Sequence, residues 1–226
     1  MTGSAPITGA RSDLVCRHRH EVDRGPRSGF TFLELIAVIA ALALLAGVVA
    51  PVVTGDIDIA KLQRAQAETE AIADALANFQ ATVGAWPTMD GNGRLDRLLV
   101  LITGTQIPSR NPYTRGHAFW RWARGSRGDL LGHHLVANSP RGQQSRQYPT
   151  AGAAAWLGPY LDTSPLDPWG RPYIVNVIAS YSNNASRHRR LWVMSAGPDG
   201  QFQTSANAGL NDDVAGDDVG YLVYQR

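Results

Sequence analysis

Five aspartates crowd residues 191–226, where the only basic residue is Arg226. They lie among glycine, asparagine and serine, at Asp199, Asp212, Asp213, Asp217 and Asp218. Carboxylate, amide and carbonyl oxygens are the ligands that Ca²⁺ prefers. The spacing lacks the Asp-x-Asp-x-Asp-Gly pattern of an EF-hand. The residues alone therefore leave two interpretations open, a calcium-binding loop and a solvated acidic loop.

Arginine and aromatic side chains alternate earlier in the chain. The set comprises Arg110, Arg115, Arg121, Arg124 and Arg127, interleaved with Tyr113, His117, Phe119, Trp120 and Trp122. Such a mixture can bind nucleic acid by pairing with phosphates and stacking on bases. More often it forms a partly buried loop whose arginines are solvated or stack on its own rings, and we favour that interpretation. His133 and His134 could ligate a metal, but adjacent histidines in a glycine-rich loop usually do not.

The sequence contains no motif that indicates an enzyme. The sequence holds no Gly-x-Ser-x-Gly, phosphate-binding loop, dinucleotide fingerprint or His-Glu-x-x-His. Cys16 is the only thiol, which excludes an intrachain disulfide framework, a cysteine zinc site and a thiol redox pair. We therefore expect a protein that is not an enzyme.

The chain has 226 residues, 44% of them hydrophobic, and this apolar content is concentrated near the start. The 21 residues Leu35–Gly55 carry no formal charge, enough for a helix of roughly 31 Å that would cross a bilayer once. An arginine-rich segment precedes them, which predicts a cytoplasmic N-terminus and an external C-terminal part. A secretory signal would have a shorter apolar region and a small-residue cleavage site.

Glu34 places a carboxylate just inside this stretch. A bare carboxylate costs several kcal/mol within hydrocarbon, so Glu34 needs a partner or a place near the interface. Judged from the helix alone, a position at the membrane interface would account for Glu34, because the dipole at a helix N-terminus favours a negative charge.

The junction Ser28-Gly29-Phe30-Thr31-Phe32-Leu33-Glu34 resembles the processing site of type IV pilin-like proteins. The resemblance implies that a prepilin peptidase removes a basic leader, residues 1–29, by cutting after Gly29. Phe30 would then be the N-methylated first residue of the mature chain. Glu34, its fifth residue, would pair with the amine of Phe30 on a neighbouring subunit and set the register of assembly.

An apolar stripe continues beyond Pro51. It recurs at spacings of three and four, through Leu62, Ala65, Thr69, Ile72, Leu76, Phe79 and Val83. Gly84 and Pro87 predict its end. We expect one helix over residues 30–83, kinked or melted between Gly47 and Pro51, or else ending and restarting there.

Short strands are predicted at Tyr173–Ile178, Leu191–Ser195 and Gly220–Tyr224. Residues 90–150 should be an irregular insertion with at most one short helix, around Arg94–Thr103. The expected fold is α+β and pilin-like: a long N-terminal helix, transmembrane in its first half (residues 30–55), packed on a small antiparallel sheet. Residues 56–226 would form the periplasmic head.

Three further motifs stand out: Gly158-Pro159-Tyr160-Leu161, Asp167-Pro168-Trp169-Gly170-Arg171 and Ser195-Ala196-Gly197-Pro198-Asp199-Gly200. They are similar to motifs of the major pseudopilin of type II secretion systems. The Asp167 motif is a structural turn. The resemblance implies calcium in the acidic loop, with Asp199, Asp217 and Asp218 as ligands and carbonyls near Ser195–Gly197 completing the shell.

The resemblance implies a subunit that polymerises through its N-terminal helix into a filament that drives protein export. It would span the bacterial inner membrane once and contact lipid, prepilin peptidase, other pseudopilins and the inner-membrane secretion platform. A minor pseudopilin and a DNA-uptake pilus subunit remain alternatives within the same class. A membrane-tethered periplasmic enzyme or binding domain is the alternative from another class.

Overall fold

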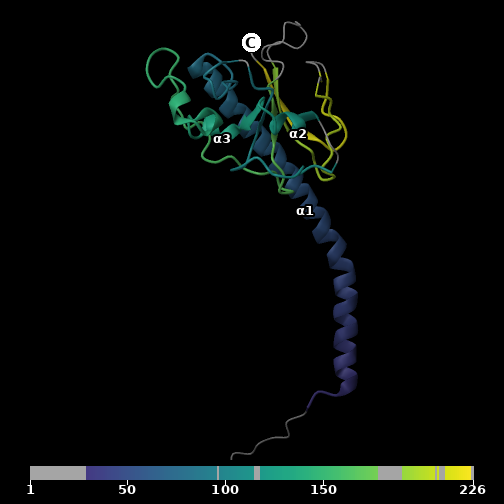
Figure 1. The fold of residues 1–226 in the computed structure, drawn as a ribbon. Helices are drawn as coiled ribbons and strands as arrows, with labels where there is room; N and C mark the ends of the chain where they lie inside the picture. Colours follow the sequence, from purple (N-terminus) through teal and green to yellow (C-terminus); the bar gives the residue numbers. More distant parts are fainter. Residues whose placement is uncertain are drawn as a thin grey trace, which may run out of the picture. The chain divides into compact units, whose positions relative to one another are not determined.

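The computed structural model describes residues 29–95, 97–114, 118–177, 190–206, 208 and 212–224, without the side chains of residues 47–55, 190 and 224. The expected leader lies outside these residues except for Gly29. The chain divides into two compact units, Met1–Ala50 and Pro51–Arg226. One long helix and a five-stranded sheet dominate it, which confirms the α+β class (Figure 1).

The long helix α1 covers Phe32–Val83. It ends where the sequence predicts, because Gly84 adopts a φ of 73° and its N–H donates to the carbonyl of Gln80 at 2.8 Å. The helix continues through Pro51, so the expectation of a melted turn or a restart there is wrong. The boundary between the two compact units nevertheless falls at this proline.

The expected membrane-crossing stretch extends into residues 47–55, whose side chains are not described. Among the described residues, no helix combines the length and the apolar character that membrane crossing requires.

The sheet has the order β2-β1-β3-β4-β5. Its strands are β1 (Val100–Ile102), β2 (Gly128–Leu130), β3 (Ile174–Asn176), β4 (Arg190–Ser195) and β5 (Val219–Tyr224). The three predicted strands correspond to β3, β4 and β5, which pair antiparallel. β1 pairs antiparallel with β3 but parallel with β2, so the sheet is mixed and larger than the small antiparallel sheet we expected.

The expectation of an irregular segment at residues 90–150 is also wrong. This segment supplies β1 and β2, the helices α2 (Ala118–Ala123) and α3 (Leu131–Leu135), and the single 3₁₀ turns η1 (Pro140–Gly142) and η2 (Gln144–Arg146). A strand stands where a short helix was predicted. β1 is a central strand covered on both faces, so its sequence is a continuous apolar run that periodicity cannot separate from a buried helix.

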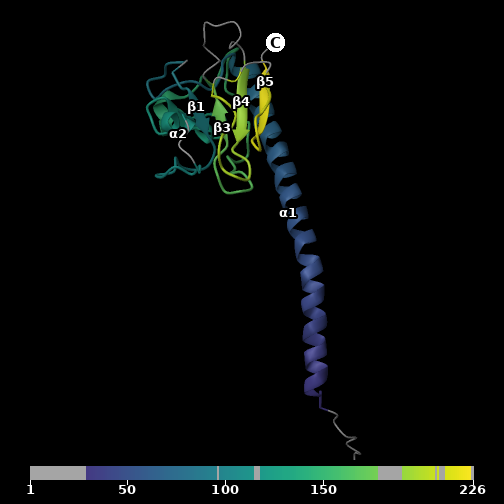
Figure 2. The same cartoon turned by 90° about the vertical axis from the view of Figure 1, so that its right-hand side faces the viewer.

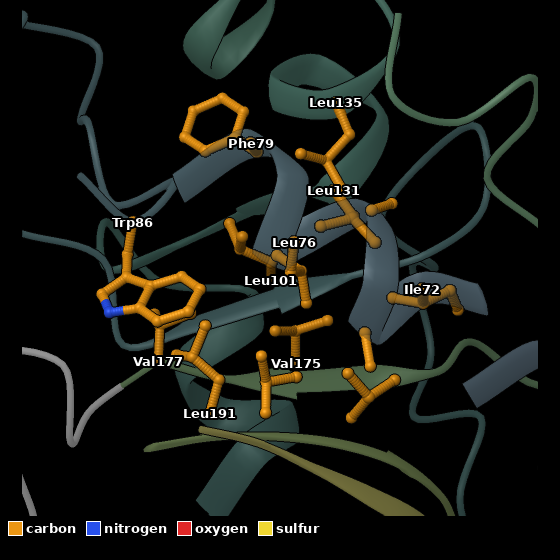
Figure 3. Packing of buried hydrophobic residues seen from close by; sticks show 14 of the residues in the cluster. Ile72, Leu76, Phe79, Trp86, Leu101, Leu131, Leu135, Val175, Val177 and Leu191 are labelled. Atoms are coloured by element: carbon orange, nitrogen blue, oxygen red, sulfur yellow. The ribbon is translucent and has the colours of Figure 1, made fainter. Parts of the chain in front are cut away.

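Two apolar clusters cover the two faces of the sheet. On one face the predicted stripe of α1, including Ile72, Leu76 and Phe79, packs against Leu101 and Val175 (Figure 3). On the other face the helix α2 packs over alternate residues of the same strands. That second cluster holds Val100, Ile102, Ile174, Trp192 and Met194 with Phe119, Trp120 and Ala123. Figure 2 shows the strands β1, β3, β4 and β5 side by side.

Candidate functional site

The start of α1 places Gly29, Phe30 and Glu34 together in an accessible segment. An ideal Cβ built on Gly29 would meet no atom within 4 Å, and Phe30 is 91% exposed. Thr31 and Glu34 cap the helix reciprocally. The Thr31 N–H donates to Glu34 Oε2 at 2.9 Å, and the Glu34 N–H donates to Thr31 Oγ1 at 3.2 Å.

The first turns of α1 expose large apolar side chains. Phe32 is 79% exposed and Leu33 77%, and the exposed set continues through Leu35, Ile36, Val38, Ile39, Leu42, Leu44 and Leu45. A soluble monomer rarely exposes so continuous an apolar surface. This part of the helix therefore requires a covering of lipid or protein.

The acidic loop between β4 and β5 brings the three predicted metal ligands close to Gln203. The Gln203 Nε2 atom donates to Asp199 Oδ2 and to Asp217 Oδ1, each at 2.9 Å. The Gln203 N–H donates to Asp218 Oδ2 at 3.0 Å. Asp212 and Asp213 stay exposed.

Asp218 is the buried member of this group, with 9% of its surface exposed. Its Oδ2 also accepts from the Thr204 N–H at 2.7 Å, whereas Oδ1 is buried without a hydrogen-bond partner. Burial raises the pKa of this carboxyl above its ordinary value, against the backbone hydrogen bond from Thr204. Among the described residues, no three carboxylate, imidazole or thiol groups are placed to hold one metal ion.

The Asp167 turn anchors the beginning of this loop. Asp167 Oδ1 accepts from the N–H groups of Trp169 and Arg171, at 3.0 and 2.7 Å, and its Oδ2 accepts from Ser195 Oγ at 2.6 Å. The Arg171 guanidinium donates to the carbonyl of Gly197. This carbonyl is one of those expected to complete a calcium shell, and in the structure it already accepts from an arginine.

Gly197 is required by the close packing of this loop. Its φ is 56°, and a Cβ at this position would lie 2.0 Å from the carbonyl oxygen of Asp217. A side chain here would push the two ends of the acidic loop apart.

A second polar cluster, centred on Asp129 of β2, was not predicted. Asp129 is 2% exposed and accepts four hydrogen bonds. The imidazoles of His133 and His134 donate at 2.7 and 3.0 Å, and the N–H groups of Leu130 and Arg141 donate at 2.8 and 2.6 Å. Burial opposes ionisation of Asp129, but the bonds from the histidines outweigh it and hold the pKa of its carboxyl well below the ordinary value.

His134 is completely buried within this cluster. Its Nε2 donates to Asp129, so its Nδ1 accepts from the hydroxyl of Tyr148 at 2.7 Å. Burial lowers the pKa of His134, although Asp129 opposes the shift. The pair of histidines thus ties β2 to α3 and to Tyr148, and the only signal in the sequence was their adjacency.

Known proteins resemble this chain along most of its length. A family model described as Type II secretion system (T2SS), protein G matches residues 142–214. The type II secretion system core protein G of Escherichia coli is 26% identical over 176 residues, which cover 78% of this chain and 85% of that protein. The core protein G of Klebsiella pneumoniae is 24% identical over 192 residues, covering 85% and 95%.

One solved structure also matches. The crystal structure of the major pseudopilin from the type 2 secretion system of enterohaemorrhagic Escherichia coli aligns at 18% identity and a TM-score of 0.30, over 74% of this chain and 90% of that one. The motifs around Asp167 and Asp199 lie within the matched family region, whereas most of the 90–150 segment lies outside it. Among known proteins, the chain is thus similar to the type II secretion system protein G family, the major pseudopilins.

Proposed function

We propose that this chain is the filament subunit of a type II secretion pseudopilus, anchored once in the bacterial inner membrane with its head in the periplasm. The main support for this proposal is the exposed apolar surface of the helix, which begins at Phe30, directly after the accessible Gly29. Lipid would cover this surface before assembly, and neighbouring helices would cover it in the filament. The role is structural, and it implies contacts with prepilin peptidase, other pseudopilins and the secretion platform.

Processing is tested by mass spectrometry of the protein extracted from membranes that contain a prepilin peptidase. We expect a mature chain that begins at N-methylated Phe30, and Gly29→Glu should leave the precursor uncut. Persistence of the full-length wild-type chain beside the peptidase would favour the membrane-tethered domain.

Assembly is tested at Glu34, whose carboxylate would neutralise the amine of Phe30 on the neighbouring subunit. Glu34→Gln should insert and be processed normally but enter filaments poorly. The matched control is Thr31→Ala, which removes the capping partner and keeps the charge. Equal loss of filaments in both variants would mean that Glu34 acts only as a cap.

We also propose that the acidic loop rearranges to bind Ca²⁺ through Asp199, Asp217 and Asp218. The cation would have to displace the Gln203 amide, which donates to both Asp199 and Asp217. The unpartnered Oδ1 of Asp218 supports this, because a buried carboxylate oxygen without a donor is the kind of ligand a hard cation takes. A bound cation would offset the repulsion among the three carboxylates. It would stabilise the native state by RT ln(1 + [L]/Kd), about 2.7 kcal/mol at 100 times Kd.

Calcium binding is tested by melting the protein with millimolar calcium and with chelator. The melting temperature should rise with calcium, and magnesium should substitute poorly because it demands a tighter octahedron. Asp218→Asn should abolish the rise, whereas Asp213→Asn, at an exposed position of the same loop, should keep it. If the chelator does not change the melting temperature, the loop does not bind calcium and is simply a solvated acidic loop.

A further inference from the structure

A polar segment follows α3. Residues 138–148, called the strap below, contain no hydrophobic or aromatic side chain except those of Pro140 and Tyr148, and residues 142–147 are exposed. Tyr148 is 2% exposed, and its ring meets the Phe79 ring of α1 edge-on at a centroid distance of 5.0 Å. A segment that buries so little apolar surface opens more readily than the sheet, because hydrogen bonds are most of what holds it.

The backbone of the strap is strained at two positions. Asn138 and Arg141 have φ angles of 45° and 58°, and among the described residues no others except glycines lie in the left-handed region. This region is unfavourable for side-chain-bearing residues, above all for arginine, since asparagine tolerates it better.

Polar contacts hold both strained residues in place. The Tyr148 N–H donates to Asn138 Oδ1 at 2.8 Å, and Asn138 Nδ2 donates to the Tyr148 carbonyl at 3.2 Å. The Arg141 N–H donates to Asp129 Oδ2 at 2.6 Å, and the Arg141 guanidinium donates to the carbonyl of Gly128. The strap therefore has strain to release once these contacts are broken.

His134 connects the strap to β2 from a completely buried position. Its Nε2–H donates to Asp129 Oδ2 at 3.0 Å, and its Nδ1 accepts from the Tyr148 hydroxyl at 2.7 Å. The hydroxyl oxygen of Tyr148 also accepts from the backbone N–H of Met89. This chain of bonds requires a neutral ring, with one nitrogen that donates and one that accepts.

A second proton on His134 would break this chain. Nδ1 would become a donor facing the hydroxyl oxygen of Tyr148, and the hydroxyl proton would lose its acceptor. Because Tyr148 is buried, that proton would be left without a partner, which is costly. An open strap removes the conflict, since water then satisfies both side chains.

The groups that face His134 act on its protonation in opposite directions. Asp129 on β2 favours the proton, whereas His133 on α3 and Arg141 in the strap oppose it. Burial is the largest influence, and it lowers the pKa of His134 below the ordinary value of 6.5. Opening would return the pKa towards that value, so a fall in pH favours the open strap.

We propose that residues 138–148 form an acid-released strap, which opens when His134 takes a second proton while the sheet stays folded. The sheet can outlast the opening because Tyr148 is the only strap residue in the cluster that covers this face. Opening would withdraw the Tyr148 ring from Phe79, so the surface of the head would change with the acidity of its surroundings. This switch does not depend on filament formation.

The test is hydrogen exchange of the full-length chain in detergent at pH 7.5, 6.5, 5.5 and 5.0, followed by mass spectrometry of peptides. Rates are corrected for the intrinsic effect of pH on exchange. Protection of the strap should fall below pH 6.5, by up to about tenfold for each pH unit. Protection of β3 and β4 should stay unchanged over the same range.

Two matched variants separate the histidines. His134→Gln removes the titrating group, so protection of its strap should not depend on pH in this range. His133→Gln makes the same change on the neighbouring residue, which also bonds to Asp129 but not to Tyr148, and should keep the release. In the wild-type chain, the titration of His134 by nuclear magnetic resonance should have the same midpoint as the release of the strap.

Three outcomes would overturn the proposal. The first is a strap that is equally protected at pH 7.5 and pH 5.0. The second is simultaneous loss of protection in the strap and the sheet, which would mean unfolding of the whole head. The third is an unchanged pH dependence in a folded His134→Gln protein. If that variant does not fold, a His134 midpoint that differs from the wild-type release rejects the switch.

Discussion

Asp129 carries the largest concentration of hydrogen bonds on any side chain of the 90–150 segment that the structure describes. Asp129→Asn keeps the shape but turns one acceptor atom into a donor that faces other donors. We expect a loss of about 3 kcal/mol in unfolding free energy by denaturant titration at pH 7. Asp90→Asn, in an open turn, should lose about 1 kcal/mol or less. Equal losses would refute a special role for the buried cluster.

The pH dependence of stability should follow His134. Its pKa is lowered in the folded state, so the unfolded chain binds a proton that the folded chain excludes. Stability is then complete above the unfolded pKa, about 6.5, and falls as the pH drops below it. Asp129, whose folded pKa is also depressed, adds a further loss below about pH 4. His134→Gln should flatten the decline between pH 6.5 and 5 in the denaturation midpoint, and an unchanged slope would contradict this assignment.

At the scale of elements, the contact between α2 and β2 depends on the missing side chain of Gly128. Gly128→Ala would place a methyl group on the backbone of Ala123 and displace α2, at a cost of about 1–3 kcal/mol. Gly132→Ala is the matched control within α3, where the added Cβ meets Ser164 at an ordinary 3.4 Å and alanine favours helix. The control should be neutral or stabilising in thermal melts. A Gly128→Ala protein as stable as the control would show that the contact can relax.

Some elements can be predicted from the sequence because local residue preferences determine them. Gly84 ends α1 with the left-handed conformation that glycine favours, and the apolar spacing of Ile72, Leu76 and Phe79 identified the buried face. β2 could not be found, because Gly-Asp-Leu has no strand preference and forms a strand only by pairing with β1. The Asp129 cluster could not be predicted from the sequence either, because its hydrogen-bond donors come from separate elements.

At the scale of the molecule, the division at Pro51 predicts an independent head. The core clusters draw on residues from Ile72 onward, so the fragment 56–226 retains every side chain of both. It should show the far-ultraviolet spectrum of a folded α+β protein and melt cooperatively, within a few degrees of the processed chain in detergent. A broad transition without cooperativity would mean that the first half of α1 is needed for folding.

The order of the strands also governs when the protein can fold. β1 pairs with β3 through Ile102 and Ile174, and the cluster that covers the stripe of α1 is completed by Val223 of the last strand. At 5–20 residues per second, a ribosome needs on the order of ten seconds to pass from Phe79 to Val223. Throughout that interval the stripe is made but the cluster that covers it is incomplete. The head therefore folds only after synthesis is almost finished, and a chain truncated before β5 would be a target for proteolysis.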